Sequence, residues 1–186
     1  MVIVRKLSPE TQEVFLEFMD GPAFESQPRW LGCYCQAYLN TKEENDVSTP
    51  ETNRLSACHR IDSGVMNGYL AFESEDADSK VIGWLSANAH NNYRLLPSVP
   101  DEKTATLICF SIQKQHQGTG IANHLLEFAL KDLKEQDFTT VQAAPIDSEE
   151  FQDWGYRGSL GMYLKHGFSK VTKLDDMHVL VSKTLT

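Results

Sequence analysis

The sequence predicts a mixed α/β protein in which helices pack against one β-sheet. Strand-like runs alternate with amphipathic helical segments along the 186 residues, 41% of the residues are hydrophobic, and the chain contains no repeat, low-complexity tract or interdomain linker. A chain of this length favours one domain and can bury roughly 70% of its unfolded surface. We therefore expect a single domain over residues 1–186 that folds without disulfides.

The charge balance and the apolar runs exclude several classes of protein. Twenty-six acidic and 17 basic side chains give a net charge of −9, which argues against an extended basic face for DNA or RNA. No stretch approaches the ~20 apolar residues of a membrane span, and the N-terminus lacks the apolar run of a signal peptide. Four cysteines suit a reducing compartment. We expect a cytoplasmic protein with no nucleic-acid or membrane partner, either a monomer or a homodimer.

The first part of the chain alternates between extended and helical patterns. Residues 2–7 form a strand-like run, and Ser8, Pro9 and Glu10 then supply an N-cap, a first-turn proline and an acidic first turn for a helix that ends at Gly21. The stretch 25–50 is predicted to be a loop with helical pieces. A second helix is expected from Thr49-Pro50 to about Gly64.

The middle of the chain carries the strongest strand signals. Residues 69–72 and 81–85, separated by a charged turn, predict a hairpin, and residues 88–100 are predicted to be irregular. Residues 106–112 are apolar on both alternate faces, as expected of a central strand that is covered on two sides.

The last part of the chain predicts a long helix and the remaining strands. Apolar residues recur every three to four positions between Gly120 and Gln136, so one face of that helix is buried. A strand over 139–144, a short helix over 158–166 and final strands at Val171 and 178–182 follow. The final strand could close this sheet or pair with another copy of the chain.

A glycine-containing turn, residues 112–122, joins the central strand to the long helix. Helix-start N–H groups have no internal partner and lie at the positive end of the helix dipole, and Gly118 and Gly120 would let a ligand approach the backbone. The expected ligand is a phosphate or pyrophosphate. The turn lacks the Gly-Lys-Ser/Thr of a Walker loop, and Asn123 stands where a dinucleotide fingerprint needs glycine. A tight turn without a ligand is the alternative.

This turn resembles a known family signature. Gln117-x-x-Gly120-x-Ala122 is similar to the Gln/Arg-x-x-Gly-x-Gly/Ala motif of the GNAT superfamily of acyl-CoA-dependent N-acyltransferases. The context agrees, because an apolar strand precedes the motif, an amphipathic helix follows it, and residues 162–168 resemble the later Tyr-x-x-x-Gly-Phe element. The resemblance is sharp over residues 106–174 and looser over residues 2–85.

The resemblance implies a fold, a co-substrate and a set of binding residues. The implied fold is a GNAT-like mixed, mostly antiparallel sheet flanked by helices, with a splayed central strand pair. The backbone of residues 117–122 would bind the pyrophosphate of acetyl-CoA. The strand 110–112 would pair with the pantetheine arm, and a backbone N–H there would polarise the thioester carbonyl. The implied binding residues are Phe110, Ser111, Ile112, Gln117, Gly118, Thr119, Gly120, Ile121 and Ala122.

The resemblance also implies a general acid but leaves the base open. Tyr163 matches the tyrosine that protonates the leaving CoA thiolate, although a packed aromatic with a hydrogen-bonded hydroxyl is the alternative. The implied mechanism is direct attack by an amine. Many relatives place a Glu on the central strand, but Thr106 and Ile108 stand there. Water relays to His90, Asp101, Glu102 or Asp153 are conceivable, and none is assigned.

Several other candidates have both functional and structural interpretations. Cys33-x-Cys35 could bind zinc or exchange disulfides, but it lacks a second ligand pair, and packing is the stronger interpretation. Residues 30–38 lie where GNAT-like proteins cover the acceptor site. His116 could contact a phosphate, and residues 154–159 and 91–94 could be functional loops or structural anchors. Lysines that could meet the ribose phosphate, or be ordinary surface residues, are Lys114, Lys131 and Lys134.

The sequence thus predicts an N-acetyltransferase that moves the acetyl group of acetyl-CoA to a primary amine, with no metal. The acceptor is unidentified, because loops set specificity on such folds. The alternative is a noncatalytic CoA-binding or sensor protein on the same fold. A third hypothesis is a thiol or zinc interaction protein built around Cys33 and Cys35.

Overall fold

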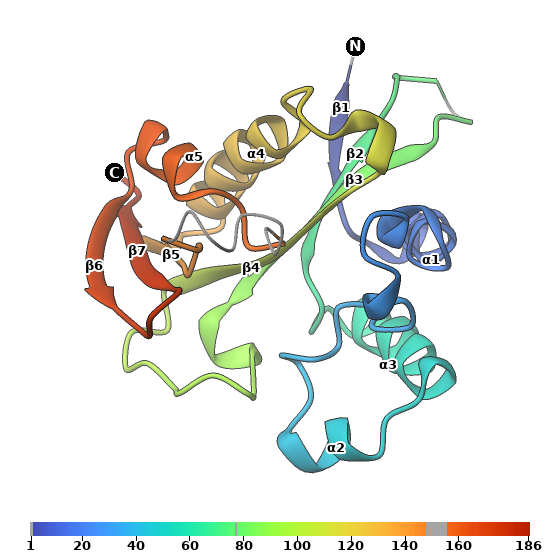
Figure 1. Ribbon diagram of the computed structural model, residues 1–186, viewed down its shortest axis with the longest axis horizontal. Helices are drawn as coiled ribbons and strands as arrows, with labels where there is room; N and C mark the ends of the chain where they lie inside the picture. Colours follow the sequence, from blue (N-terminus) through green and yellow to red (C-terminus); the bar gives the residue numbers. More distant parts are fainter. Residues whose placement is uncertain (1, 77, 148–155) are drawn as a thin grey trace.

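The structure is a computed structural model that describes residues 2–76, 78–147 and 156–186. Its centre is one seven-stranded sheet with strand order β1-β2-β3-β4-β5-β7-β6 (Figure 1). The strands are β1 (Ile3–Lys6), β2 (Gly68–Phe72), β3 (Val81–Ala89), β4 (Thr104–Ile112), β5 (Thr140–Ala143), β6 (Ser169–Lys173) and β7 (Val179–Thr184).

The sheet splays apart at its middle. Every neighbouring pair of strands is antiparallel except β4 and β5, which are parallel. β5 pairs only with the Thr104–Leu107 half of β4. The second half of β4, Ile108 to Ile112, therefore keeps β3 on one side and has no β5 partner on the other. This half strand is the edge at which the candidate site lies.

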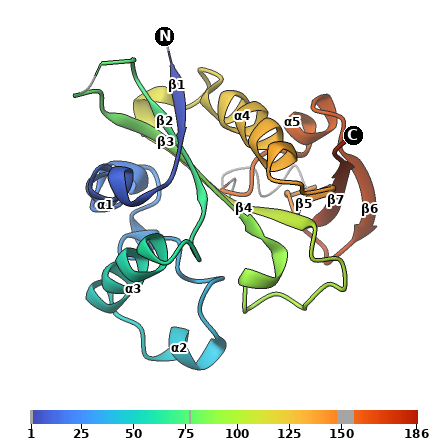
Figure 2. The ribbon, with the colours of Figure 1, turned by 180° about the vertical axis from the view of Figure 1, so that it is seen from behind.

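Helices cover both faces of the sheet (Figures 1 and 2). α1 (Gln12–Met19), α2 (Lys42–Asp46) and α3 (Pro50–Asp62) lie on one side, and α4 (Ile121–Glu135) and α5 (Leu160–Lys165) lie on the other. Short 3₁₀ helices connect them: η1 (Pro9–Thr11), η2 (Pro22–Phe24), η3 (Pro28–Trp30), η4 (His90–Asn92) and η5 (Lys114–His116). No helix within the described residues is long and apolar enough to cross a membrane.

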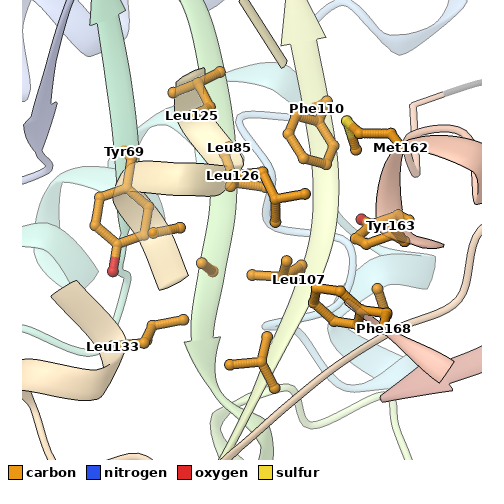
Figure 3. Packing of buried hydrophobic residues seen from close by; sticks show 14 of the residues in the cluster. Tyr69, Leu85, Leu107, Phe110, Leu125, Leu126, Leu133, Met162, Tyr163 and Phe168 are labelled. Atoms are coloured by element: carbon orange, nitrogen blue, oxygen red, sulfur yellow. The ribbon is translucent and has the colours of Figure 1, made fainter. Parts of the chain in front are cut away.

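Each face has its own hydrophobic cluster. On the α4 side, Leu125, Leu126 and Leu133 pack against Leu85 and Leu107 of the sheet (Figure 3). On the α1 and α3 side, the cluster is built around Phe15, Trp84 and Tyr93, with the rings of Phe15 and Trp84 4.8 Å apart. Burying apolar area on both faces contributes the main stabilisation, at about 25 cal/mol per Å². The same packing on both faces holds the splayed half of β4 in place between the two clusters.

A β-bulge changes which way the side chains of β4 point. Ser86 pairs with Cys109, but the next residue, Ala87, pairs with Leu107, so Ile108 is the extra residue. Leu107 and Phe110 belong to the α4-side cluster, whereas Ile108 and Cys109 both pack toward the α1 and α3 side. A bulge thus turns Cys109 away from the face that strict alternation with Leu107 would give it.

The fold class expected from the sequence is confirmed, with local differences. β3 continues through Ala89, so the predicted irregular segment begins only after that residue. The first turn after Ser8 is a 3₁₀ helix, and α1 starts at Gln12. The final strand closes this sheet, because β7 lies between β5 and β6.

Candidate active site

A cavity of about 930 Å³ opens along the splayed half of β4. It runs from the N-terminus of α4 past β4 to the loop before α2. Eight of the ten site residues predicted from the sequence line it, namely Phe110, Ser111, Ile112, Gln117, Gly118, Gly120, Ile121 and Ala122, whereas Thr119 and Tyr163 do not. The volume lies in the range of small-molecule sites, ~300–1,000 Å³.

The turn between β4 and α4 forms an open cradle. Gly118 (φ +76°) and Gly120 (φ +93°) both adopt left-handed conformations, and a Cβ built on either would meet no atom within 4 Å. Gly120 is the N-cap of α4, so the N–H groups of Ile121 and Ala122 have no intrahelical acceptor. Free donors, the positive end of a helix dipole and unfilled space fit a pyrophosphate group.

The Gln117 side chain holds the turn that forms the cradle in place. Its amide Nε2 donates to the carbonyl of Ile112 at 3.0 Å and to the hydroxyl oxygen of Ser26 at 3.1 Å. The first bond satisfies a carbonyl at the end of β4, and the second joins the turn to the chain that follows η2. This side chain therefore orders the cradle from two directions without adding a charge.

The edge of β4 is in contact with the turn before α5. The N–H of Phe110 donates to the carbonyl of Tyr156 at 2.5 Å. Gly158, with φ +76°, packs so closely that a Cβ there would lie 2.7 Å from Met162 and 3.2 Å from Phe110. Residues 156–158 thus lie against the splayed edge where a pantetheine arm is expected to pair.

Tyr163 lies in the core behind the cavity wall. Its side chain is 0% exposed, and its ring packs 5.1 Å from Phe168 and 6.5 Å from Phe110 (Figure 3). Its hydroxyl donates to the carbonyl of Arg157 at 2.9 Å. Burial raises the pKa of this phenol, so the side chain stays neutral and keeps its proton to donate.

The other end of the cavity is lined by aromatic residues. Trp30 and Tyr156 lie with ring centroids 5.7 Å apart, and the Arg157 guanidinium lies 5.3 Å from the ring of Tyr38 and donates to the hydroxyl oxygens of Tyr38 and Tyr156. Burial raises the pKa of Tyr38 to about 12. This end of the cavity, bounded by Trp30, Tyr38, Leu95 and Tyr156, is called the aromatic arm below.

Cys33, Cys35 and Cys109 line the cavity beside the aromatic arm. The indole Nε1 of Trp84 donates to the Cys35 sulfur at 3.1 Å. Within the described part of the chain, no three His, Cys, Asp or Glu side chains are grouped so that they could hold a metal ion. The zinc interpretation of Cys33 and Cys35 therefore has no ligand set there.

The residues considered for a water relay, none of which was assigned, do not line the cavity where the structure describes them. His90 is buried in a network in which Nδ1 lies 2.7 Å from the Thr106 hydroxyl and 2.6 Å from the Gln142 amide, while Nε2 lies 2.8 Å from the Pro97 carbonyl. Asp101 and Glu102 precede β4 and do not line the cavity. Asp153 and Trp154 fall outside the described residues. The described cavity wall contains no Asp or Glu.

The basic candidates divide between the two ends of α4. Lys131 pairs with Glu135 at 3.9 Å, and Lys134 donates to the carbonyl of Thr186. Both lie at the C-terminal end, some 15–20 Å along the helix from the cradle at 1.5 Å per residue. They do not lie near the cradle, which agrees with the alternative that they are ordinary surface residues. His116 lines the cavity, and Lys114 is exposed on η5.

Sequence reasoning missed the contribution of residues 23–27. Ala23, Phe24 and Ser26 line the cavity, and Ser26 bonds to Gln117 of the cradle although the two residues are 91 positions apart in sequence. No local sequence pattern predicts that these residues line the cavity. They reach it because the 3₁₀ helix η2 packs against β3 and β4, and this packing joins segments far apart in the chain. The stretch 30–38, expected to cover an acceptor site, does supply Trp30, Cys33, Cys35, Ala37 and Tyr38.

Comparisons with known proteins found a matching family model and similar solved structures. The family model described as Acetyltransferase (GNAT) family matches residues 29–168. No curated protein matches the chain. Similar solved structures include an N-acetyltransferase from Staphylococcus aureus Mu50 (TM-score 0.60, 14% identity, 100% of this chain and 99% of that chain).

Two further solved structures show the same fold. One is the PaiA N-acetyltransferase from Thermoplasma acidophilum in complex with coenzyme A (TM-score 0.59, 20% identity, 99% of each chain). The other is a ribosomal-protein-alanine N-acetyltransferase from Brucella melitensis (TM-score 0.60, 11% identity, 98% of this chain and 99% of that chain). At these identities the likeness concerns the fold alone.

Proposed function

Because the chain belongs to the GNAT acetyltransferase family, we propose that it transfers the acetyl group of acetyl-CoA to a primary amine. The observation that carries this proposal is the continuity of the cavity, which runs from the glycine cradle along the splayed half of β4 to the aromatic arm. The reaction needs three sites in the same order: one for the pyrophosphate, one for the extended arm that bears the thioester, and one for the acceptor amine.

The cradle supports acetyl-CoA as the co-substrate. Its described wall contains no Lys or Arg, so phosphate oxygens would be bound by the backbone N–H groups of Gly118, Gly120, Ile121 and Ala122. The Gln117 side chain, already bonded to Ile112 and Ser26, would keep these donors in place. The solved PaiA relative, which has the same fold, is in complex with coenzyme A.

Two hydrogen-bond donors support transfer beside β4. The Phe110 N–H would polarise the thioester carbonyl, and the Tyr163 hydroxyl would protonate the leaving sulfur. These two donors bond to the consecutive carbonyls of Tyr156 and Arg157. Binding of the thioester would therefore require residues 156–157 to move away from β4, exchanging two internal acceptors for the carbonyl and sulfur of the substrate.

The aromatic arm would receive the acceptor. Its wall offers Trp30, Tyr38 and Tyr156, whose rings supply apolar surface for the body of an acceptor molecule. The amine would then attack the thioester carbon directly and displace CoA.

The proposal is tested by calorimetric titration with acetyl-CoA, followed by a screen of primary amines for CoA release. We expect saturable one-to-one binding that Gly120→Val abolishes, because the valine would fill the cradle. Gly64→Val is the matched control. Gly64 also has a left-handed φ (+70°) and open space at its Cβ, but it follows α3, away from the cavity.

The outcomes separate the alternatives. No binding to the wild-type protein would overturn the acyl-CoA assignment, and equal affinity in Gly120→Val would overturn the cradle. Binding without CoA release for any amine would favour the noncatalytic CoA-binding protein.

A further inference from the structure

The proposed transfer needs a base, and the cavity wall offers an unusual set of candidates. An amine is protonated at neutral pH and must lose a proton before it can attack a carbonyl. Among the residues described along the cavity, none is Asp, Glu, Lys or Arg, and the side chains that ionise are His116, three thiols and two phenols. His116 lies at the cradle, at the phosphate end. The thiols lie at the end where the amine would enter.

Cys109 occupies a special position among these thiols. It precedes Phe110, whose N–H faces the expected thioester, and the bulge at Ile108 turns its side chain to the acceptor side of β4. Bulges beside active sites commonly re-aim one side chain in this way. Its sulfur lies 3.9 Å from the Ser111 hydroxyl, and the residue is half-buried on the cavity wall.

Cys35 faces Cys109 from the loop after η3. Cys35 lines the same cavity as Cys109 and packs in the same cluster, and its sulfur accepts a hydrogen bond from Trp84 Nε1 at 3.1 Å. Interaction with the Cys35 side chain is the main cause that lowers the pKa of Cys109; Ser111 and the charge of Arg157 act in the same direction, while burial opposes them. The same contact raises the pKa of Cys35, which stays a thiol.

The backbone that holds Cys35 is strained and firmly anchored. Tyr34 (φ +45°) and Cys35 (φ +54°) are consecutive non-glycine residues in the left-handed region, which costs roughly 1–2 kcal/mol for each. The fully buried Gln36 locks the turn, because its amide donates to the Tyr34 carbonyl at 2.8 Å and its Oε1 accepts from Arg60 at 2.6 Å. Strain that is maintained in this way is a feature of functional sites.

We propose that the Cys109 thiolate, positioned by the Cys35 thiol, is the general base that takes a proton from the acceptor ammonium. This proposal rests on the proposed acetyl transfer. Cys109 takes one proton and becomes a neutral thiol. The amine nitrogen then bonds to the acetyl carbon, and the carbon–sulfur bond of the thioester breaks. The CoA sulfur receives the proton of the Tyr163 hydroxyl, and the second proton of the nitrogen restores that hydroxyl. Cys109 returns its proton to water, so the net products are an amide, CoA thiol and one proton.

The groups around Cys109 determine whether its sulfur is a thiol or a thiolate. The groups that interact with it electrostatically are Cys33 and Cys35 from one loop, Tyr38, Tyr93, Arg157 and Tyr163. Arg157 is the one permanently charged member and favours the thiolate. The phenols are neutral at pH 7 because burial raises their pKa values.

The first test is alkylation by iodoacetamide between about pH 6 and about pH 10, followed by peptide mass spectrometry, because the thiolate is the form that reacts. We expect Cys109 to react with a midpoint below the ~8.5 of a free cysteine, and Cys35→Ala to raise that midpoint by about one unit. Cys58→Ala, on α3 and outside the cavity, should leave it unchanged. A midpoint at or above that of free cysteine would overturn the proposal without any acceptor being known.

The second test uses an amine found by the CoA-release screen. Cys109→Ser should lower kcat about 100-fold while the Kd for acetyl-CoA stays the same, and Cys35→Ala should move the acidic limb of the pH profile upward. Unchanged kcat in Cys109→Ser would overturn the proposal. Incubation with acetyl-CoA alone is the further check, because an acetyl adduct on Cys109 would make it a nucleophile and overturn its role as base. If the wild-type protein does not bind acetyl-CoA, the proposed function itself is overturned. That result is distinct from the outcomes that test Cys109.

Discussion

The backbone N–H of Phe110 and the carbonyl of Tyr156 are joined by a 2.5 Å hydrogen bond across the splayed edge of β4. The next carbonyl, that of Arg157, accepts from the hydroxyl of Tyr163. The two donors expected to serve the thioester are therefore both held by one short turn. A ligand that accepts hydrogen bonds from these two donors must displace the carbonyls of the turn. Cofactor binding therefore depends on the position of the turn.

This relationship predicts a specific spectroscopic response. Acetyl-CoA should shift the backbone amide resonance of Phe110, because a thioester carbonyl replaces the Tyr156 carbonyl as its acceptor. CoA, which lacks the acetyl group, should shift it less while still affecting the amides of Gly118 and Gly120. Two-dimensional NMR of ¹⁵N-labelled protein measures both. Identical Phe110 shifts with the two ligands would contradict the assignment.

Tyr163→Phe should separate chemistry from packing. Removing the hydroxyl leaves the Arg157 carbonyl without this donor and should cost about 1–3 kcal/mol of unfolding free energy. We also expect kcat to fall by about 10²–10⁴ with little change in acetyl-CoA affinity. Tyr69→Phe is the control, since its buried hydroxyl donates to Asp132 at 2.8 Å, away from the cavity. Equal turnover in both variants would remove Tyr163 from the mechanism.

Gln117→Ala should weaken acetyl-CoA binding by about tenfold, equivalent to about 1.4 kcal/mol, because the cradle loses its bonds to Ile112 and Ser26. Ser26→Ala, which removes one of the two bonds, should have a smaller effect. Gln115→Ala, on the exposed face of η5, should have none. Calorimetry gives all three affinities, and equal losses for Gln115 and Gln117 would refute this role.

Arg60→Leu should destabilise the loop that carries Cys35. Arg60 Nη1 donates to Gln36 Oε1 at 2.6 Å and to Asn40 Oδ1 at 2.7 Å, and both acceptors belong to buried side chains. Leaving them unpaired should lower the unfolding free energy by about 3 kcal/mol. Arg54→Leu, which breaks an exposed pair with Asp20, should cost under about 1 kcal/mol. Urea unfolding measures the loss of unfolding free energy in both variants, and equal losses would contradict this prediction.

The turn before β7 predicts a pH dependence of stability. Hydrogen bonds from the backbone N–H of Met177, then from the His178 side chain and backbone N–H, lower the pKa of Asp175 to about 2. An unfolded Asp has a pKa of about 3.9, so this carboxylate stabilises the fold above about pH 4 and the effect is lost as pH falls toward 2.

Asp175→Asn should therefore lower Tm at pH 7, and the difference from wild type should close between about pH 4 and about pH 2. Asp176→Asn, whose carboxylate is fully exposed, is the control. A constant Tm difference across this range would exclude the carboxylate as the cause.

The sequence alone identified the elements whose patterns are local. The apolar run before Ile112, the glycine turn and the amphipathic α4 are each readable within about a dozen residues, and the family resemblance that they carry implied eight residues of the cavity wall. The start of α3 was readable for the same reason, because Thr49 accepts from the N–H of Thr52 three residues ahead. At the other expected N-cap, the Ser8 side chain makes no capping bond, and the Ser8 N–H donates to Thr11 Oγ1 at 2.9 Å instead.

Only the tertiary structure decided the relationships between distant segments. The bulge that turns Cys109 toward Cys35 arises from the register between β3 and β4, and the contact of Tyr156 with Phe110 depends on where the turn before α5 packs. Likewise Lys131 and Lys134, close to the motif in sequence, lie at the far end of α4. Periodicity reports which face of an element is buried, but the register between elements depends on packing energies summed over partners far away in the chain, and no local pattern encodes that sum.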